Sequence, residues 1–498
     1  MNQRLVLGLL LCIVLGVVIV SGGCDAAQTA NPPQTVDVSR PNIVYILADD
    51  LGYGDVSCLN KNSKIHTPNL DQLGKEGIIF TDAHSGSAVC TPTRYGILTG
   101  RYCWRSRLKK GVLNGYSNHL IEDGRLTVAS MLKTQGYQTA CIGKWHLGWH
   151  WQKKDDDISE VDFTKPILHG PTTNGFDYSF CIPASLDMPP YVYVENDRVT
   201  AVPNRIVEGK KGKSLMREGP TGADFKHIEV LPRLTEKAVA YIENCKQKNK
   251  PFFLYFPLPA PHTPILPTKE FQGQSGTNEY GDFVLQVDWT VGEIMKTLKR
   301  NGMKKNTLII FTSDNGCSPQ ADFDELAQFG HDPSYIFRGH KADIFEGGHR
   351  VPFFARWPAR VKARSVCDDT TCLTDLMATA AAIVDFTMPA EAGEDSVSML
   401  PNLLGTATGP LREATVHHSV NGSFSIRQGK WKLELCRGSG GWSPPIPNSQ
   451  EAKELPPIQL YDLSQDIGET INLQDQYPEV VEHLKGLLQK YIDSGGST

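Results

Sequence analysis

The chain has 498 residues, of which 40% are hydrophobic, and it contains 45 glycines and 32 prolines. This length and composition can bury a large core and exclude a disordered or fibrous protein, and the glycines and prolines indicate the many loops of a large α/β enzyme. The formal net charge is only -5, and without a block of lysine and arginine nothing indicates a nucleic-acid or membrane-surface binder. The expected partner is a small or carbohydrate-like ligand.

The N-terminus has the layout of a secretory signal, because Arg4 precedes an apolar run over residues 5–20 and small residues follow it. We predict a signal peptide over residues 1–27, a polar linker over 28–39, and export to the periplasm or the medium. The apolar run is short for a membrane span, and no later segment approaches that length. Cys24 follows two glycines and resembles the acceptor of a bacterial lipoprotein, so a lipid anchor there is the one membrane attachment expected.

The twelve cysteines are too sparse for a disulfide scaffold and form no C-x-x-C pair, which excludes a zinc finger. Cys367 and Cys372 are close enough in sequence to bridge in an oxidising compartment. Most of the other cysteines are expected to be buried small apolar residues.

From Arg40 onward, short β-branched runs alternate with helical patterns, and this alternation predicts a mostly parallel central sheet flanked by helices. A first domain is predicted over residues 40–409. Its elements, in chain order, are a strand at 43–47, a helix after the cap-like Asn69, a helix at 126–136, a strand through Ala140 and Ile142, a helix at 231–244, a strand at 252–256, a helix at 283–300 and a strand at 308–311.

The pattern changes after about Gly409. Strand-like pieces at 423–427 and 431–435 precede a terminal amphipathic helix, which predicts a small α+β subdomain over 410–498 with an antiparallel sheet. Two further regions have the composition of loops. The segment 149–222 is predicted to make excursions over the edge of the sheet, where substrate loops tend to lie, and the segment 438–457 is a Gly/Pro/Ser-rich loop.

Four of the predicted strands run into polar residues of the kinds that catalysis uses. Ligands bind beyond the carboxyl ends of parallel strands, so these residues are expected to converge on one rim. They are Asp49 and Asp50, Lys144 and His146, His262, and Asp314 and Asn315.

Asp49, Asp50, Asp314 and Asn315 offer only oxygen ligands, a set that suits calcium or magnesium and not zinc. An adjacent Asp pair alone is more often part of a turn or cap, but two oxygen-rich strand ends together favour a divalent ion. Lone histidines such as His84 are more often structural residues than further ligands.

The segment 90–94, Cys-Thr-Pro-Thr-Arg, is the most specific feature of the chain. Pro92 suits the first turn of a helix, which would place Cys90 at the positive N-terminal end of the helix dipole and Arg94 about one turn further on. That arrangement favours an anion. The alternative is a plain buried or reactive thiol, but Leu-Thr-Gly-Arg at 98–101 extends the pattern.

This Cys-x-Pro-x-Arg segment followed by Leu-Thr-Gly-Arg resembles the modification motif of type I sulfatases, in the arylsulfatase A-like branch of the alkaline phosphatase superfamily. The resemblance implies an alkaline phosphatase-like α/β core with a mostly parallel sheet, plus a small C-terminal α+β subdomain. Ile467 stands where many relatives carry proline. Further matches occur in order at residues 143–146, 261–264, 313–316, 338–341, 346–352, 460–463 and 472–473.

The resemblance implies a sulfatase that hydrolyses a sulfate ester with formylglycine, made by oxidation of Cys90. It also implies one bound Ca²⁺, and a formylglycine-generating or sulfatase-maturating enzyme as a partner during biogenesis. The implied metal ligands are Asp49, Asp50, Cys90, Asp314 and Asn315.

Roles for the remaining polar residues also follow from the resemblance. Arg94, Lys144 and Lys341 would surround the formylglycine and sulfate with positive charge, His146 would assist the hydrated aldehyde, and His262 would be the general acid for the leaving oxygen. The hydrate offers two hydroxyls on one carbon. One attacks sulfur, and the other later loses its proton to expel sulfate, which regenerates the aldehyde.

Several residues have a structural alternative. Lys341 could be a solvated surface lysine, since lysine is mostly exposed. His417 and His418 could either reach the pocket from the subdomain or form a surface pair. Trp149 and Trp151 could stack on a sugar or lie elsewhere.

Export and long polar loops suggest a sulfated polysaccharide or its oligosaccharides as substrate, with galactose- or galactosamine-type units. One alternative keeps the fold and changes the chemistry to that of a phosphodiesterase or phosphonate hydrolase. The cysteine in the motif and the single oxygen site favour the sulfatase. A second alternative is a non-catalytic binder of sulfated glycans, which requires Cys90 to stay unmodified.

Overall fold

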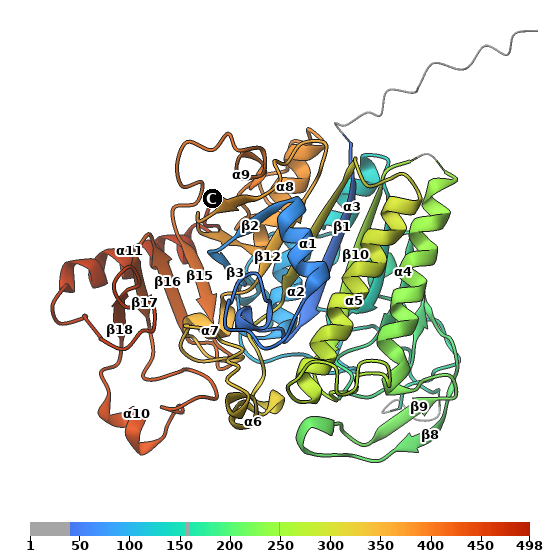
Figure 1. Cartoon of the computed structure of the whole chain (residues 1–498), viewed down its shortest axis with the longest axis horizontal. Helices are drawn as coiled ribbons and strands as arrows, with labels where there is room; N and C mark the ends of the chain where they lie inside the picture. The colour runs from blue at the N-terminus through green and yellow to red at the C-terminus, as the bar shows by residue number, and fades with distance from the viewer. Residues whose placement is uncertain (1–39, 156–159, 249) are drawn as a thin grey trace, which may run out of the picture. The chain divides into compact units, whose positions relative to one another are not determined.

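The computed structural model describes residues 40–155, 160–248 and 250–498 (Figure 1). The predicted signal peptide, linker and lipid-anchor residue Cys24 lie outside the described residues. In the described part of the chain, no helix combines the length and the apolar character that a membrane span requires.

The main body is built on one large sheet. Within the described residues it has ten strands, in the order β13 (Ser365–Cys367), β2 (Ile78–Phe80), β12 (Phe353–Arg356), β11 (Thr307–Ser313), β1 (Asn42–Asp49), β10 (Phe252–Pro261), β4 (Gln138–Lys144), β5 (Tyr178–Ile182), β6 (Val194–Glu195) and β7 (Arg198–Val199). From β11 to β5 all neighbours are parallel, while β12, β6 and β7 add antiparallel pairs towards the edges. The predicted mostly parallel sheet is confirmed.

The sequence of β1 shows why this strand is central. Seven of its eight residues are buried, and they read as an almost continuous apolar run because both faces of a parallel sheet are covered. Alternate side chains enter different cores: Tyr45 and Leu47 belong to one apolar cluster, Val44 and Ile46 to the other. β10 extends beyond the predicted 252–256 to Pro261. The prediction ended too early because the proline-rich end of this strand has the composition of a loop, although it lies fully buried in the sheet.

Helices cover both faces of the sheet (Figure 1). On one face α1 (Pro68–Glu76), α4 (Val230–Lys246) and α5 (Glu279–Arg300) pack their apolar sides on the sheet. On the other face lie α2 (Cys90–Thr99), α3 (Val128–Thr134) and α8 (Leu376–Ile383). This two-faced cover is the predicted α/β layering.

Two helix starts differ from the prediction. α1 begins at Pro68, so Asn69 is inside the helix, where its side-chain amide donates to Asp288 Oδ2 (2.7 Å). α5 begins four residues before the predicted start, because the Asn278 side chain accepts hydrogen bonds from the backbone of Tyr280 and Gly281 and thereby caps the helix.

The segment 149–222, predicted as excursions, also supplies β5, β6 and β7 to the main sheet, so that prediction was incomplete. Its later part forms a hairpin of β8 (Pro203–Val207) and β9 (Gly219–Gly222). The shorter elements that follow or flank the sheet are β3 (Ala83–His84), α6 (Phe323–Gln328), α7 (Glu346–His349), β14 (Thr371–Cys372) and α9 (Leu400–Leu404).

The C-terminal region contains a four-stranded antiparallel sheet, in the order β15 (Thr415–His418), β16 (Phe424–Gln428), β17 (Trp431–Glu434) and β18 (Gln459–Asp462). The terminal helix α11 (Pro478–Asp493) packs on this sheet through Val481, Leu484 and Leu488 (Figure 1). The predicted antiparallel sheet and terminal helix are therefore confirmed. The loop between β17 and β18 contains a short helix, α10 (Gln450–Glu454), which composition alone did not predict.

All ten described cysteines are free thiols. Cys367 and Cys372 therefore do not form the bridge that their spacing suggested; the amide of Asn402 lies 3.2 Å from Cys367 Sγ instead. Most of the others are buried, as predicted, although Cys58 is exposed.

Candidate active site

The carboxyl ends of the central strands bring the predicted site residues to one end of the sheet. Asp49 is the last residue of β1 and lies beside Pro261, the last residue of β10, so His262 follows directly. On the other side of β1, Ala48 pairs with Ser313 at the end of β11, which places Asp314 next to the same point. Lys144 ends β4, the strand beyond β10.

Three acidic side chains and Cys90 form the centre of this site. The backbone of Asp50 is left-handed (φ 65°), a conformation that Asp tolerates better than most residues, and its N–H donates to Asp314 Oδ1 (3.2 Å). The ligand atoms of Asp49, Cys90 and Asp314 all lie within 4.8 Å of one another, and all three residues are buried.

Two buried oxygen atoms in this centre have no hydrogen bond in the described chain: Asn315 Oδ1, and Asp49 Oδ1, which has an ion pair with Arg94 Nη2 at 3.5 Å. The amide of Asn315 is fixed by donation to Asp50 Oδ1 (2.7 Å), which turns its oxygen away from that bond. Buried oxygen atoms without partners are costly unless a cation or another donor satisfies them. The donor set therefore fits a hard divalent ion.

Three cationic side chains neutralise these carboxylates. Lys144 Nζ donates to Asp49 Oδ2 (2.6 Å) and Lys341 Nζ to Asp50 Oδ2 (2.6 Å). Arg94 donates through Nε (3.1 Å) and Nη2 (2.7 Å) to Asp314 Oδ2. Lys341 is 6% exposed, so the solvated-surface alternative for it is wrong.

The pKa values of the carboxylates reflect this crowding. Burial opposes ionisation of Asp49, but Lys144, His262 and Arg94 outweigh it and hold the pKa of Asp49 below its usual range. Burial and the charge of Asp49 together raise the pKa of Asp314, in spite of Arg94. A bound cation would relieve this repulsion between Asp49 and Asp314.

Cys90 is the first residue of α2, with Val89 in an extended conformation before it and Pro92 in the first turn. The thiol is 2% exposed, and burial raises its pKa although Lys144 and Lys341 act in the opposite direction. An unmodified Cys90 is therefore a protonated thiol and a weak nucleophile.

His146 is buried and has a left-handed backbone (φ 53°). Its Nε2–H donates to the carbonyl of Leu113 (2.7 Å), and its Nδ1 has no partner in the described chain. Burial, Lys144 and Arg94 lower the pKa of His146 well below its usual value. The imidazole is neutral and offers the lone pair of Nδ1.

His262 is only 7% exposed, and its Nε2 is the ring nitrogen nearer the carboxylates of the site. Nδ1 donates to the carbonyl of Thr263 (2.7 Å), while Nε2 lies 3.6 Å from Asp50 Oδ2. The backbone bond fixes the ring, so any proton that His262 gives to a ligand has to come from Nε2.

Ser185 is a polar residue near this end of the sheet that no sequence motif indicated. It follows β5, whose last residue Ile182 pairs with Lys144, and the N–H of His146 donates to the carbonyl of Pro183 (3.1 Å). The Ser185 hydroxyl is buried without a partner in the described residues. The loop-rich composition around it gave no signal.

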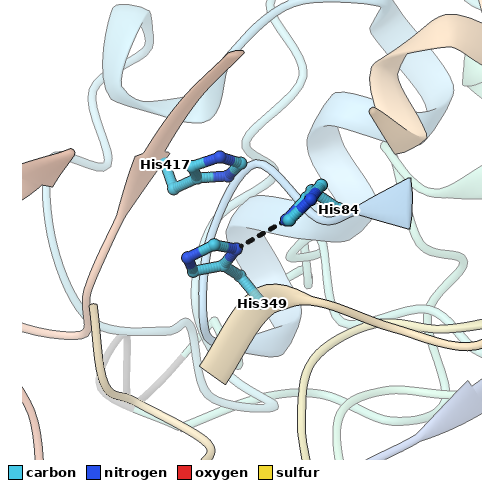
Figure 2. A group of neighbouring side chains, drawn as sticks. All are labelled: His84, His349 and His417. Atoms are coloured by element: carbon cyan, nitrogen blue, oxygen red, sulfur yellow. Dashed lines mark hydrogen bonds between the residues drawn. The ribbon is translucent and has the colours of Figure 1, made fainter. Parts of the chain in front are cut away.

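The burial of the side chains decides between the alternatives left open for two tryptophans and two C-terminal histidines. Trp149 is fully buried and Trp151 is 6% exposed, so neither ring is open to a sugar. His417 and His418 are also buried, and the surface pair is therefore wrong. His417 instead joins His84 and His349 in a cluster at the junction with the C-terminal sheet (Figure 2).

In this histidine cluster, β3, α7 and β15 each contribute one ring (Figure 2). Nδ1 of His84 and Nδ1 of His349 are 3.0 Å apart, and the rings of His349 and His417 stack at 3.9 Å and 9°. The other ring nitrogens also have hydrogen-bond partners: Asp82 for His84, the Ile344 carbonyl for His349, and the Ser85 carbonyl and the Thr415 hydroxyl for His417. The cluster is therefore a packing and hydrogen-bonding unit in this structure.

The histidine cluster predicts acid-sensitive stability. Burial is the largest cause that lowers the pKa of His84, His349 and His417 in the folded protein, whereas the unfolded chain binds protons below about pH 6.5. The free energy of unfolding should therefore fall as pH drops from 7 towards 5, which urea titrations at several pH values would measure. The charged neighbours are Asp82, Glu346, Arg350, Arg427 and Lys432.

A matched pair of variants separates this cluster from other titrating groups. His417→Gln should reduce the loss of stability between pH 7 and 5, whereas His483→Gln, at an exposed histidine of α11, should leave it unchanged. The carboxylates of Asp82 and Glu346 act at lower pH, because nearby cations and histidines hold their pKa values below the usual range despite burial. An unfolding free energy that stays flat from pH 7 to 5 would contradict the expectation.

Similarity to known proteins is evidence that does not depend on the geometry of the site. The Sulfatase family model matches residues 41–386. The N-acetylgalactosamine-6-O-sulfatase of Bacteroides thetaiotaomicron is 35% identical and covers 96% of this chain and 98% of its own length. Human arylsulfatase A is 33% identical over 90% of this chain and 87% of its own. A solved structure from work on glycosaminoglycan metabolism by Bacteroides thetaiotaomicron aligns with a TM-score of 0.80 at 36% identity, over 91% of this chain and 99% of the other.

Proposed function

Because the chain belongs to the sulfatase family, as an arylsulfatase A-like sulfuric ester hydrolase of the alkaline phosphatase superfamily, we propose that its nucleophile is Cys90 oxidised to formylglycine. We further propose that one calcium ion is held by Asp49, Asp50, Cys90, Asp314 and Asn315. The observation that carries both proposals is the approach of the Asp49, Cys90 and Asp314 side chains to within 4.8 Å of one another in a buried site.

When bound, the calcium ion would activate the attacking hydroxyl and offset charge on a sulfate oxygen. The charges of the protein support such an ion. The three carboxylates are matched by Arg94, Lys144 and Lys341, so a divalent cation leaves a positive excess for the anionic substrate. Asp49 Oδ1 and Asn315 Oδ1, which accept no hydrogen bond in the described chain, are available to bind it.

Formylglycine explains why an oxidised cysteine suits this site. Its hydrate supplies two hydroxyls on one carbon, one to attack sulfur and one to expel sulfate, whereas a serine or cysteine ester would depend on an external water. Cys90 is 2% exposed in the folded chain, so the proposed maturation enzyme would act before folding is complete.

The cationic residues would hold the sulfate group in position. Arg94 and Lys144 are fixed by their bonds to Asp314 and Asp49, and Lys341 by its bond to Asp50. Fixed charges in a buried site stabilise the growing negative charge without having to reorganise during the reaction. The carboxylates would thus have two roles: they would bind the metal, and they would hold the three cationic side chains in place.

His146 and His262 would transfer protons in different steps of the reaction. His146 keeps Nε2–H on the Leu113 carbonyl, so its free Nδ1 is the atom that accepts a proton when sulfate is expelled. His262 keeps Nδ1–H on the Thr263 carbonyl, so its Nε2 is the atom that donates a proton to the leaving oxygen.

The role of His262 predicts a dependence on the leaving group. His262→Ala should lower kcat/KM about 10²- to 10³-fold for a sulfated sugar, whose alkoxide is a poor leaving group, because general acid catalysis contributes that much. The loss should be far smaller for 4-nitrophenyl sulfate, whose phenolate leaves without a proton. His483→Ala, at an exposed site, is the control. Equal losses on both substrates would refute the assignment.

We propose that the substrate is a sulfated carbohydrate of the 6-sulfated N-acetylgalactosamine type. The similarity to the bacterial N-acetylgalactosamine-6-O-sulfatase over nearly the whole length of both chains supports this class. The test is sulfate release from a panel that contains the 6-sulfates of N-acetylgalactosamine, galactose and N-acetylglucosamine and the 4-sulfate of N-acetylgalactosamine. Turnover of simple aryl sulfates alone would overturn the carbohydrate assignment.

The remaining sequence predictions stand as proposals. We propose that residues 1–27 direct export, with Cys24 as a lipid acceptor, and that the mature chain divides into a catalytic domain at 40–409 and a subdomain at 410–498. Mass spectrometry of the protein purified from the cell envelope tests the first proposal, through the mature N-terminus and any lipid mass.

A further inference from the structure

Trp442 differs from the other tryptophans of the chain. All eight lie in the described residues. Five are at most 7% exposed, and Trp289 and Trp431 are half-buried, but Trp442 is 43% exposed. Its indole N–H makes no hydrogen bond within the described part of the chain. Such an exposed indole requires a reason, because a tryptophan normally buries most of its large apolar surface.

The backbone around Trp442 is fixed by a buried carboxylate. Asp343 is fully buried, and its Oδ1 accepts hydrogen bonds from the N–H groups of Trp442 (2.7 Å) and Ser443 (3.1 Å). The other oxygen, Oδ2, accepts from the N–H of His340 (2.9 Å). Asp343 thus ties the Trp442 backbone to the segment that carries Lys341, two positions earlier.

The residue before Trp442, Gly441, lies directly against the backbone of Ala342. A Cβ on Gly441 would lie 2.4 Å from the carbonyl oxygen of Ala342, so only glycine fits there. The N–H of Ile344 donates to the Ser439 carbonyl (2.8 Å). The loop from the C-terminal sheet is therefore held against the residues that follow Lys341, and Trp442 has a defined position.

The same segment connects this loop to the proposed nucleophile. The N–H of Ala342 donates to the carbonyl of Ala88 (2.8 Å), two residues before Cys90, and the N–H of Val420 donates to the carbonyl of Ala342 (3.0 Å). Figure 1 shows α10, in the same loop, at the same end of the molecule as α6. Trp442 is therefore an exposed side chain on a loop that is hydrogen-bonded to the segment after Lys341, and this segment is in turn hydrogen-bonded to the backbone just before Cys90.

We propose that the Trp442 indole is the platform on which the sugar ring of the sulfated substrate stacks. This inference rests on the proposed carbohydrate substrate. The fixed cations hold the sulfate group in the buried centre, so the ring that carries it lies towards solvent. A pyranose has one face of C–H groups, which an aromatic face covers well, and the free indole N–H can donate to a ring hydroxyl.

Steady-state kinetics test this proposal. Trp442→Ala should raise KM for the sulfated sugar about 10- to 50-fold, since covering about 60–90 Å² of apolar surface accounts for that range, and should change kcat little. Trp442→Phe should recover most of the loss. Inhibition of aryl sulfate hydrolysis by inorganic sulfate should be unchanged, because sulfate occupies only the centre. An unaltered KM for the sugar in Trp442→Ala would overturn the proposal.

Fluorescence gives a readout that does not depend on turnover. In a Cys90→Ala background, the sulfated sugar should shift the tryptophan emission of the protein, and this shift should disappear when Trp442→Phe is added. The control is Trp431→Phe, in which the shift should persist, because the indole of Trp431 packs against Tyr477 (4.9 Å between ring centroids). A shift that survives Trp442→Phe would overturn the platform alone. Turnover of aryl sulfates with no sulfated sugar would overturn the proposed substrate as well.

Discussion

Replacement of Cys90 by alanine is expected to abolish sulfate release while leaving the fold intact. The substitution removes the atom that becomes the proposed nucleophile, and loss of an enzyme's nucleophile typically costs about 10⁴-fold or more in kcat. Alanine is a good helix former and fits the first position of α2, so the cost in stability should be small. Sulfate release by ion chromatography and the thermal unfolding midpoint measure the two effects separately.

Cys103→Ala is the matched control, because Cys103 is an equally buried thiol whose Sγ lies near Ser106 Oγ (3.6 Å) and not among the carboxylates. Its activity should be retained. Cys90→Ser should be inactive unless the host oxidises serine. Mass spectrometry of the tryptic peptide 76–94 should show the aldehyde. Undiminished activity in Cys90→Ala would refute the nucleophile, and an unmodified thiol with retained glycan binding would favour the non-catalytic binder.

Much of the fold could be predicted from the sequence, since its central strands have a strong local signature. β1 is buried on both faces and is therefore apolar almost throughout, which marks it as a strand of a parallel sheet. The end of β10 could not be predicted in this way, because Pro257, Pro259 and Pro261 are typical of loops. Their neighbours in the sheet, and not their own preferences, keep them extended.

The candidate site was predictable wherever a side chain follows directly from a strand end or from the Cys90 helix. Ser185 and Trp442 were not, because each lies in a loop whose position depends on contacts with distant residues: Pro183 with His146, and Trp442 with Asp343. A local pattern carries no information on such contacts. His417 was ambiguous for a related reason, since β15 is short and both faces of it are covered.

Removal of divalent metal is the second change expected to have a very large effect. Chelation should abolish hydrolysis, and added calcium should restore it, because Asp49 and Asp314 would otherwise face each other across a buried site in which two oxygens accept no hydrogen bond. Calcium should also raise the thermal unfolding midpoint of the apo protein, since an ion that binds only the folded state stabilises it. This second measurement does not require a modified Cys90.

Asp314→Asn tests the ligand set directly, because it keeps the shape of the side chain and removes one charge. The variant should lose about 10³-fold or more in kcat/KM and most of the calcium-dependent rise in the unfolding midpoint, and Arg94 would keep only its longer ion pair with Asp49 Oδ1 (3.5 Å) in a fully buried position. Asp324→Asn, at an exposed residue of α6 near the same end of the sheet, should retain both properties. If Asp314→Asn still responds to calcium as the parent does, then the ion is bound elsewhere, and the proposed centre of Asp49, Cys90 and Asp314 is wrong.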